Sequence, residues 1–488
     1  MKRIGIVLLV IALVFCACGR AEEEHSQEQG QNVPDTENPA ETEVQADVET
    51  EIDWLSTLPE ASYDGFEFGI LAVPEEVCIG IQSFYAEEQT GEIINDTVFE
   101  RNAYVEKLYD IAISYEGRSG VISQTSNLVK AGDETFAIVS DEAKLHLASS
   151  TKGIFWNLHS IDALDLTAPW WYRDAVDSLT IAGKLYEGYS DINTQIKDRV
   201  ACMFVNMDLI EDNNLDNPYG LVLEGKWTLD VMTDMAHVAT KDLNGDGRIT
   251  QEDIAGTVVG IGTYNQLTNG CDQPLATKDE DGNVVLQYGS EAFINAAQKI
   301  AKQVDDPTIR IYLNTDMWGF EHFREGKALL LNNSPCEYKN LREYDSHFGI
   351  LPVPKYDEAQ KEYRSMMNNS SMGLSIPASI KDPERVGTII EALNAYSYMN
   401  LKDAYFETVL KGKMARDEES VQMLDIITTT FIVDYGVMNE NTWADIISGW
   451  MSTMQSRGPE GLAALYAANQ EKFNKLYTKI LNAYEKLP

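Results

Sequence analysis

Residues 202–256 read CMFVNMDLIEDNNLDNPYGLVLEGKWTLDVMTDMAHVATKDLNGDGRITQEDIAG, and oxygen-bearing side chains recur at alternate positions near the end of this stretch. A twelve-residue calcium loop needs oxygen donors at positions 1, 3 and 5, a carbonyl at 7, often a water-bridging side chain at 9, and a carboxylate at 12. Gly247 at position 6 permits the sharp turn, and Ile249 at position 8 anchors the loop. The pattern predicts one Ca2+ site, with donors Asp242, Asn244, Asp246, the carbonyl of Arg248, Thr250 and Asp253.

The last ligand position of this loop departs from the usual pattern. Asp253 stands where a glutamate is common, so it binds with one oxygen or draws the loop tighter, and Glu252 is a weaker substitute. A turn that binds nothing is the alternative. Regulatory calcium loops usually occur in pairs, and only the loop at 242–253 is present. We therefore expect a structural clamp, in which the metal stabilises the folded state.

The first twenty residues, MKRIGIVLLVIALVFCACGR, begin with Lys2 and Arg3, continue as an apolar run and end in small residues around two cysteines. The run is too short to cross about 30 Å of hydrocarbon, so it predicts a secretion signal rather than a membrane span. The ending VFCACG resembles a bacterial lipobox, where a peptidase cuts before a cysteine that becomes diacylated. We expect a signal peptide over 1–17 and lipidation of Cys18. Because Phe15 stands where lipoboxes usually carry leucine, an ordinary cleaved signal is the alternative.

An acidic tail follows the signal. Residues 21–53 contain twelve Asp or Glu and no Lys or Arg, so we expect residues 18–55 to form an extended, disordered linker between the anchor and the folded part. With this tail and the three basic residues of the first twenty set aside, residues 54–488 still carry a formal charge of −31. That charge argues against nucleic acid or an anionic surface as a partner.

The cysteines beyond the signal are widely spaced and form no C-x-x-C motif. A zinc ribbon and a disulfide-dense scaffold are therefore excluded, whereas one or two disulfides remain open. We expect most of these residues to be buried thiols. They are Cys78, Cys202, Cys271 and Cys336.

Short apolar runs that predict strands alternate with stretches of helical periodicity, which indicates an α/β chain. Residues 290–304 start with Ser290 as an N-cap, and 382–399 carry Pro383 in the first turn. Residues 459–486 repeat apolar side chains at the spacing of a docked amphipathic helix. The predicted strands are residues 66–73, 135–140, 199–206, 328–332, 348–353 and 372–377.

The opening stretch, 202–256, resembles one in the extracellular solute-binding proteins of bacterial ABC transporters, family 1. In that family a strand ending in Asn and Asp or Lys leads to a GKWT helix and a D-x-NGDG loop. FGILPVPKYDEAQKEYRS (348–365) and NNSSMGLSIPAS (368–379) resemble the family's second-lobe strand and its crossover to the first lobe. YFETVLKGKMARDEESVQMLDII (405–427) is similar to a recurring segment of the family in Gram-positive gut bacteria. The resemblance extends from about 66 to 488.

This resemblance implies a two-lobed, periplasmic-binding-type α/β fold whose lobes close like a hinge on a solute, often a mono- or oligosaccharide. Lobe 1 is expected at 60–200 and 372–410, and lobe 2, with the calcium loop, at 201–371 and 411–488. The implied partners are a carbohydrate or other small polar solute and the permease subunits of an ABC transporter. We expect an extracytoplasmic monomer, held at the membrane of a Gram-positive cell only through its lipid anchor.

Sugar sites combine aromatic faces, which cover the C–H faces of a pyranose, with polar groups that bond its hydroxyls. The run APWWYRDAV, containing Trp170 and Trp171, lies where similar proteins place cleft residues, and three consecutive large rings cannot all point into one core. Tyr338 and Trp443 fall where related sugar binders supply stacking rings. Core packing is the alternative for Trp170 and Trp171, and an ordinary loop position is the alternative for Asp191 and Asn193. The expected solute-binding residues are Trp170, Trp171, Tyr172, Asp191, Asn193, Tyr338 and Trp443.

A secreted glycan-active enzyme and a calcium-dependent adhesion protein are the other classes of function to weigh. A glycoside hydrolase needs two placed carboxylates, but among 78 acidic residues any pair can be chosen. The chain carries no G-x-S-x-G, no HExxH and no P-loop, and its six histidines share no ligand spacing. We therefore expect transport of a solute rather than catalysis.

Overall fold

The computed structural model describes residues 52–260, 262–312, 318–341, 347–409 and 418–487. Residues 53–488 belong to one unit by their contacts. The predicted signal peptide 1–17, Cys18 and the predicted linker up to residue 51 lie outside the described residues. Within the described ranges, no helix combines the length and the apolar character needed to cross a membrane.

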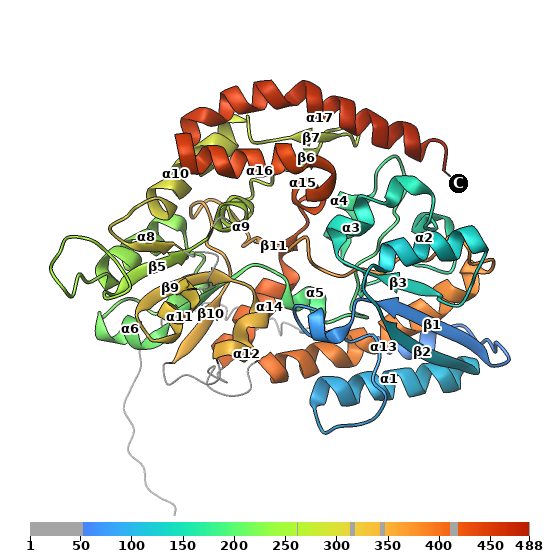
Figure 1. Cartoon of the computed structure of the whole chain (residues 1–488). Coiled ribbons are helices and arrows are strands. Elements are labelled where there is room, and N and C mark those ends of the chain that lie inside the picture. Colours follow the sequence, from blue (N-terminus) through green and yellow to red (C-terminus); the bar gives the residue numbers. More distant parts are fainter. Residues whose placement is uncertain (1–51, 261, 313–317, 342–346, 410–417, 488) are drawn as a thin grey trace, which may run out of the picture. The chain divides into compact units, whose positions relative to one another are not determined.

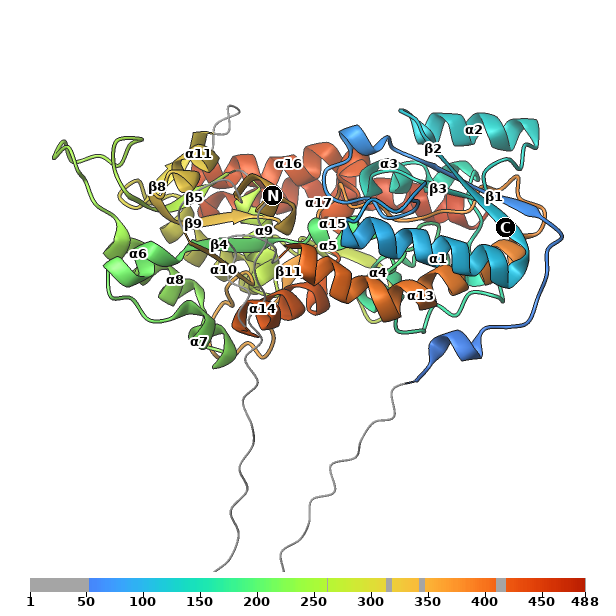
Figure 2. The same ribbon diagram turned by 90° about the horizontal axis from the view of Figure 1, so that it is seen from below.

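The first lobe is built on a three-stranded parallel sheet. Its strands, in spatial order, are β2 (Ile111–Gly117), β1 (Phe66–Ala72) and β3 (Ile138–Ser140). The central strand packs closely against the chain that enters β3, because a Cβ at Gly69 would lie 2.2 Å from the carbonyl oxygen of Thr135. Helices α1 (Ile93–Tyr109) and α13 (Pro383–Val409) lie side by side in this lobe (Figure 2), although they are far apart in the sequence.

The second lobe is built on a five-stranded sheet (Figure 1). Its strands, from one edge to the other, are β10 (Phe348–Leu351), β4 (Cys202–Asn206), β9 (Ala328–Asn333), β5 (Ala255–Val259) and β8 (Arg310–Tyr312). Strands β9, β5 and β8 are parallel, and β4 runs antiparallel to both of its neighbours. Helix α8 (Leu229–Ala239) lies so close to β5 that a Cβ at Gly256 would stand 2.3 Å from the carbonyl oxygen of Ala236.

Three connecting segments lie side by side between the two sheets and form the hinge. They are residues 199–201, β11 (Ser365–Met366) and β12 (Phe431–Ile432). The N–H of Ala201 donates to the carbonyl of Met366 at 2.8 Å, and the N–H of Met367 donates to the carbonyl of Ile432 at 2.9 Å. The predicted strand at 372–377 follows β11 as a ribbon of isolated bridges rather than a regular strand, flanked by residues 139–142 and by Gly188.

The C-terminal helix α17 (Leu462–Tyr484) contacts both lobes (Figure 1). Near its start, the side chain of Asn469 donates to the hydroxyl of Tyr288 in the second lobe at 3.1 Å. At its end, the hydroxyl of Tyr484 donates to Ser150 in the first lobe at 2.8 Å, and Lys184 donates to the carbonyl of Tyr484. The sequence predicts residues 411–488 in the second lobe. The helix begins there, but its end packs on the first lobe.

The remaining helices complete the two lobes and the region around the hinge. All four cysteines beyond the signal are free thiols, and Cys78 is the most exposed of them. The helices are α2 (Val121–Ala131), α3 (Ala143–Leu147), α4 (Arg173–Leu179), α5 (Gln195–Asp198), α6 (Met207–Asp212), α7 (Pro218–Leu223), α9 (Thr263–Gly270), α10 (Glu291–Val304), α11 (Trp318–Arg324), α12 (Tyr338–Leu341), α14 (Glu418–Thr429), α15 (Tyr435–Met438) and α16 (Glu440–Arg457); β6 (Ala276–Lys278) and β7 (Val284–Leu286) form a separate hairpin.

Candidate functional site

Both lobes route their parallel strands in the same way. In the first lobe the chain goes from β1 to β2 on one side and then to β3 on the other, and in the second lobe it goes from β5 to β8 and then to β9. When successive connections leave a central strand in opposite directions, ligands bind outside the carboxyl ends of the strands at that point. These carboxyl ends are those of β1 and β3 in the first lobe and of β5 and β9 in the second. Two of the loops that follow them have contacts with the segment joining the lobes: the loop after β1, residues 73–85, and the loop after β9, residues 334–338. We name them the first and the second switch loop.

Asp198, at the end of α5, holds the first switch loop. Its Oδ2 accepts the N–H of Ile81 at 2.7 Å, and its Oδ1 accepts the hydroxyl of Tyr405 at 2.9 Å. The carboxyl is fully buried, and burial raises its pKa to about 6 although these hydrogen bonds lower it. Gly80, with φ +107°, lies against the Asp198 side chain, so the loop turns directly over this carboxyl.

Arg199, the next residue, points to the second switch loop. Its Nη1 donates to the sulfur of Cys336 at 3.5 Å, and its Nε donates to the hydroxyl of Ser370 in the hinge at 3.0 Å. The guanidinium remains partly exposed, so it has donors to offer to a ligand. Asp198 thus contacts the first switch loop and Arg199 contacts the second. A molecule that lies between these loops is within reach of both residues.

Further hydrogen bonds fix the first switch loop to the hinge. Gln195 donates to the carbonyls of Ile79 and Ser370, at 3.0 and 3.1 Å, and accepts the N–H of Met372. Asn193, expected from the sequence to bind solute, is fully buried: its oxygen accepts the N–H of Ser83 and its amide donates to the carbonyl of Met372. Its polar atoms therefore hold the loop in place instead of facing a solute.

The first switch loop exposes two large apolar side chains beside the exposed Glu75 and Glu76. Val77 and Ile79 are 64% and 53% exposed, which is unusual for such side chains in a folded protein. Cys78 lies between them, with its sulfur 3.4 Å from that of Met372, and burial raises the pKa of this thiol to about 12. A thiol with so high a pKa stays protonated and is a poor nucleophile. The loop therefore offers contact surface for a ligand rather than a reactive group.

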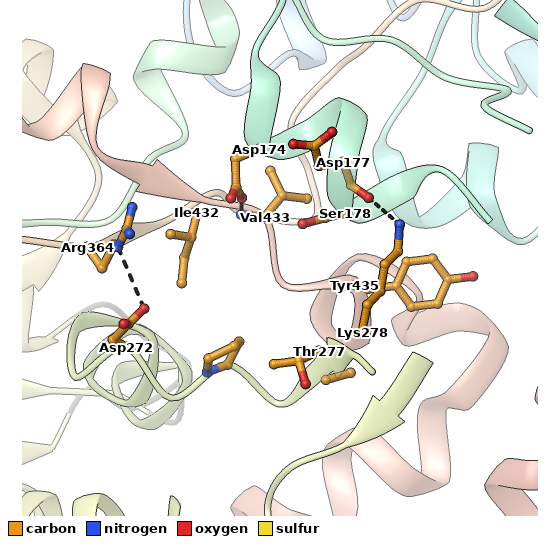
Figure 3. A pocket seen from close by; sticks show the side chains of 12 residues that line it. Asp174, Asp177, Ser178, Asp272, Thr277, Lys278, Arg364, Ile432, Val433 and Tyr435 are labelled. Atoms are coloured by element: carbon orange, nitrogen blue, oxygen red, sulfur yellow. Dashed lines mark hydrogen bonds and ion pairs between the residues drawn. The ribbon is translucent and has the colours of Figure 1, made fainter. Parts of the chain in front are cut away.

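A groove lies elsewhere, between α4 of the first lobe and the segment 272–278 of the second (Figure 3). We name it the α4 groove. Its two adjoining parts have volumes of about 260 and 550 Å³ and share Asp174, Asp177 and Arg364. Lys278 crosses it and donates to the carbonyls of Asp177 and Thr180. None of the residues that line it directly follows the carboxyl end of a strand in the three-stranded or the five-stranded sheet, so its position differs from that of the switch loops.

The α4 groove contains part of the residue set expected from the sequence. Trp171, Tyr172 and Asp191 line its larger part. Their polar atoms already have protein partners: the hydroxyl of Tyr172 donates to Asp191 at 2.9 Å, and the ammonium of the largely buried Lys197 pairs with the same carboxylate. The residues predicted from the sequence therefore lie close together, but their polar groups mainly form hydrogen bonds and ion pairs within the protein.

The other aromatic residues of that set are in the core. The indole N–H groups of Trp170 and Trp171 donate to the two carboxyl oxygens of Glu391 on α13, at 2.9 and 2.8 Å, and Trp170 is 4% exposed. Burial raises the pKa of Glu391 to about 8. Tyr338 and Trp443 are 2% and 1% exposed, so both rings are packed in the core.

The sequence analysis missed Asp198 and Arg199. The two charges stand directly before the apolar run of β4, in DRVACMFVN, which is where a chain leaves one lobe for the other. A charged pair at the edge of a predicted strand is a weak signal, because most such pairs are solvated. What distinguishes this pair is its contact with residues more than a hundred positions away, Ile81 and Cys336.

The loop at 242–253, where the sequence predicts a calcium site, is closed by hydrogen bonds to its own carboxylates. Asp242 accepts the N–H groups of Gly245 and Gly247, both at 2.7 Å, and Asp246 accepts that of Arg248 at 2.9 Å. Its donor atoms are hard oxygens, which suit Ca2+. Asp253 is turned to the loop backbone and accepts N–H groups from Leu243 and Thr250. In the described part of the chain, no three His, Cys, Asp or Glu side chains converge as a ready metal cluster.

No protein-family model matches the chain, and no curated protein matches it in sequence. Its fold does match solved structures. The cyclic α-maltosyl-1,6-maltose binding protein from Arthrobacter globiformis has a TM-score of 0.57 at 12% identity, covering 85% of this chain and 100% of that one. The ABC substrate-binding protein Lmo0181 from Listeria monocytogenes, in complex with cycloalternan, has a TM-score of 0.52 at 12% identity, covering 84% and 99%.

A third structure has the same arrangement. The maltose/maltodextrin-binding domain MalE from Bdellovibrio bacteriovorus, bound to maltotriose, has a TM-score of 0.52 at 15% identity, covering 84% of this chain and 100% of that one. Because each match spans nearly the whole of the other protein, both lobes and the hinge take part in it. The expected fold is thus confirmed: the chain has the two-lobed α/β fold of the sugar-binding, substrate-binding proteins of ABC transporters.

Proposed function

We propose that this protein captures a polar solute, a mono- or oligosaccharide, between its lobes and delivers it to the permease of an ABC transporter. One observation carries this proposal: Asp198 and Arg199, adjacent in the hinge, hold or face the switch loops of the two lobes. The similar structures add support, because three of them are named for, or contain, maltose-type or cyclic saccharides. Capture requires that the solute contact both lobes at once, and this pair lies where both are within reach.

Recognition of a saccharide at the switch loops follows from the groups there. The Arg199 guanidinium and the side chains of Glu142 and Lys144, which pair at 3.0 Å and are about one-third exposed, offer donors and acceptors for hydroxyl groups. Val77 and Ile79 offer apolar surface to the C–H faces of a sugar ring. Tyr85, 37% exposed and stacked on Tyr115, offers an aromatic face. Binding of this kind breaks no covalent bond, so we propose no catalytic step.

Arg199→Ala is expected to weaken saccharide binding by about 10- to 100-fold, because hydrogen bonds to a charged group contribute about 1.5–3 kcal/mol. The measurement is isothermal titration with the tightest ligand from a thermal-shift screen of maltotriose, cyclodextrins and other oligosaccharides. Small-angle scattering should show compaction when that ligand binds. The matched variant is Tyr172→Phe, which removes one hydroxyl from the α4 groove and should change affinity less than twofold.

The two variants distinguish a solute bound at the switch loops from a solute bound in the α4 groove. If Tyr172→Phe weakens binding and Arg199→Ala does not, the solute lies in the α4 groove and the residues expected from the sequence bind it. If no saccharide binds and the protein hydrolyses an oligosaccharide, the enzyme alternative replaces transport. If calcium-dependent protein partners are found without any solute, the adhesion alternative does.

The anchoring of the protein is also part of the proposal. A diacylated Cys18 and the acidic linker 18–55 would keep the protein outside the cytoplasm and beside its permease, as a Gram-positive cell without a periplasm requires. A single acyl chain binds a membrane only weakly, whereas two acyl chains give stable anchoring. Cys18→Ala should release the protein into the medium, and metabolic labelling with a fatty acid checks the modification. A Cys18→Ala protein that stays with the membrane would contradict it.

We propose that the loop 242–253 binds one structural Ca2+ through Asp242, Asn244, Asp246, the carbonyl of Arg248, Thr250 and Asp253. Calcium at 100 times its Kd should add about 2.7 kcal/mol to the free energy of unfolding. Chelation should lower the melting temperature and leave most of the solute affinity intact. Asp246→Asn should remove most of this calcium effect, whereas Asp281→Asn, an equal charge change at an exposed turn, should not. A melting temperature that calcium does not change would contradict the site.

A further inference from the structure

The side chain of Arg101, on α1, is fully buried, and all five of its N–H donors are used. Nη2 donates to the carbonyls of Ser83 and Phe84, both at 2.8 Å. Nη1 donates to the carbonyl of Ile192 at 2.9 Å and to the hydroxyl of Ser397 at 3.1 Å, and Nε donates to Asn102 at 3.0 Å. None of these acceptors is a carboxylate, so carbonyl and hydroxyl dipoles alone compensate the charge.

These acceptors belong to parts of the chain that must be aligned for solute binding. Ser83 and Phe84 are in the first switch loop, Ile192 leads into the hinge, and Ser397 is on α13. One planar group therefore joins the loop, the hinge segment and the helix that packs on α1. A rigid fork of donors suits this task, since each bond fixes the direction of the others.

Burying a charge without an ionic partner is costly, and burial lowers the pKa of Arg101 to about 9. An apolar side chain at this place would fill the volume but would remove the arginine donor from the carbonyls of Ser83, Phe84 and Ile192. Phe84 would keep the amide of Asn102 and Ile192 the hydroxyl of Ser83, so the cost falls mainly on the buried carbonyl of Ser83. Arg101 instead supplies one N–H donor to each of the three carbonyls. The arrangement thus fixes a loop conformation, which packing alone does not specify.

The rest of the first switch loop is fixed to the same hinge segment. The N–H of Thr194 donates to the hydroxyl of Ser83 at 2.7 Å, and the hydroxyl of Thr194 donates to the carbonyl of Ile81 at 2.9 Å. Asp198 holds the N–H of Ile81 from the other side. Arg101 binds the end of the loop that these residues do not reach, at Phe84.

We propose that Arg101 is a positioning residue, which sets the first switch loop against residues 192–199, the segment that leads into the hinge, so that the loop and Arg199 present one surface to the solute. The positioning itself does not depend on which solute binds, whereas its effect on affinity rests on the proposed function. A lysine at this place has three donors on a flexible stem and no fork, so it can replace only part of the network.

Hydrogen exchange of the solute-free protein tests the positioning. In Arg101→Met the amides of residues 79–85 should exchange at least about tenfold faster than in the wild type, and in Arg101→Lys the increase should be smaller. The matched control is Glu391→Gln, which alters another buried ionisable side chain, on α13, whose carboxyl oxygens accept the indole N–H groups of Trp170 and Trp171. That variant should lower the melting temperature without changing exchange in residues 79–85.

Affinity for maltotriose, measured at a temperature where every variant is folded, gives the second readout. Arg101→Lys should weaken it about tenfold, and Glu391→Gln should leave it unchanged. If Arg101→Met lowers the melting temperature while exchange at residues 79–85 stays at the wild-type rate, Arg101 only stabilises the fold and the proposal is wrong. If exchange rises but the wild type binds no saccharide, the positioning stands and it is the proposed function that fails.

Discussion

Replacing Trp443 by alanine is expected to lower the free energy of unfolding by about 3–5 kcal/mol and to leave solute affinity unchanged. The ring is 1% exposed and packs edge-on against Phe473 of α17 and Tyr435 of α15, with ring centroids 4.7 and 5.2 Å away. Its removal leaves a cavity where α16, α15 and α17 meet. Chemical denaturation measures the loss, and titration with the saccharide ligand measures affinity.

Trp443→Phe serves as the conservative variant. It keeps an aromatic ring at the contact with Phe473 and removes an indole N–H that is buried without a hydrogen-bond partner, so the loss of stability should be clearly smaller than for alanine. If Trp443→Ala weakens saccharide binding tenfold under conditions where the protein is folded, the ring belongs to the solute site.

The sequence is informative wherever burial follows from a local pattern. The run at 66–73 forms β1, and 290–304 forms α10, with Ser290 accepting the N–H of Phe293 as its N-cap. Helix α13 begins at the predicted Pro383 but continues to Val409, because buried side chains such as Leu401 and Tyr405 extend its apolar face. Strand β2 was not predicted, since its residues alternate between buried and exposed and form no apolar run.

The sequence is less informative wherever a distant partner decides the position of a side chain. Trp170 and Trp171 are adjacent in the sequence, yet both indoles donate to Glu391, which lies 220 or more residues away. No local pattern distinguishes this arrangement from two rings that face a sugar. For Trp443 the signal was present: Ile446, Ile447 and Trp450 follow it at helical spacing and are buried with it.

The segment that flanks the ribbon 372–377 at Gly188 contains a buried acid, Glu187, which is 1% exposed. Burial raises its pKa well above the usual value, and hydrogen bonds from Tyr189 and Gly373 offset only part of this effect. The titratable groups that face it offer no cation. His146, 4.0 Å away, is neutral because burial lowers its pKa to about 3, and burial raises the pKa of Asp141 to about 6. Tyr484 of α17, which also faces Glu187, is uncharged near neutral pH because burial raises its pKa as well.

Glu187→Gln is therefore expected to stabilise the protein at pH 8 by about 1–3 kcal/mol, the cost typical of a buried polar group that lacks full compensation. Because the folded state holds the proton more tightly than the unfolded state, the stability that Glu187 contributes is complete below the pKa of the unfolded chain. It is lost as pH rises toward the raised pKa of the folded state, so the gain from glutamine should shrink as pH falls to 4. Thermal unfolding between pH 4 and 8 measures it, with Glu142→Gln, an acid about one-third exposed that flanks the same ribbon, as the control. A gain that is equal at every pH would mean that Glu187 is ionised in the folded protein and that a cation compensates it.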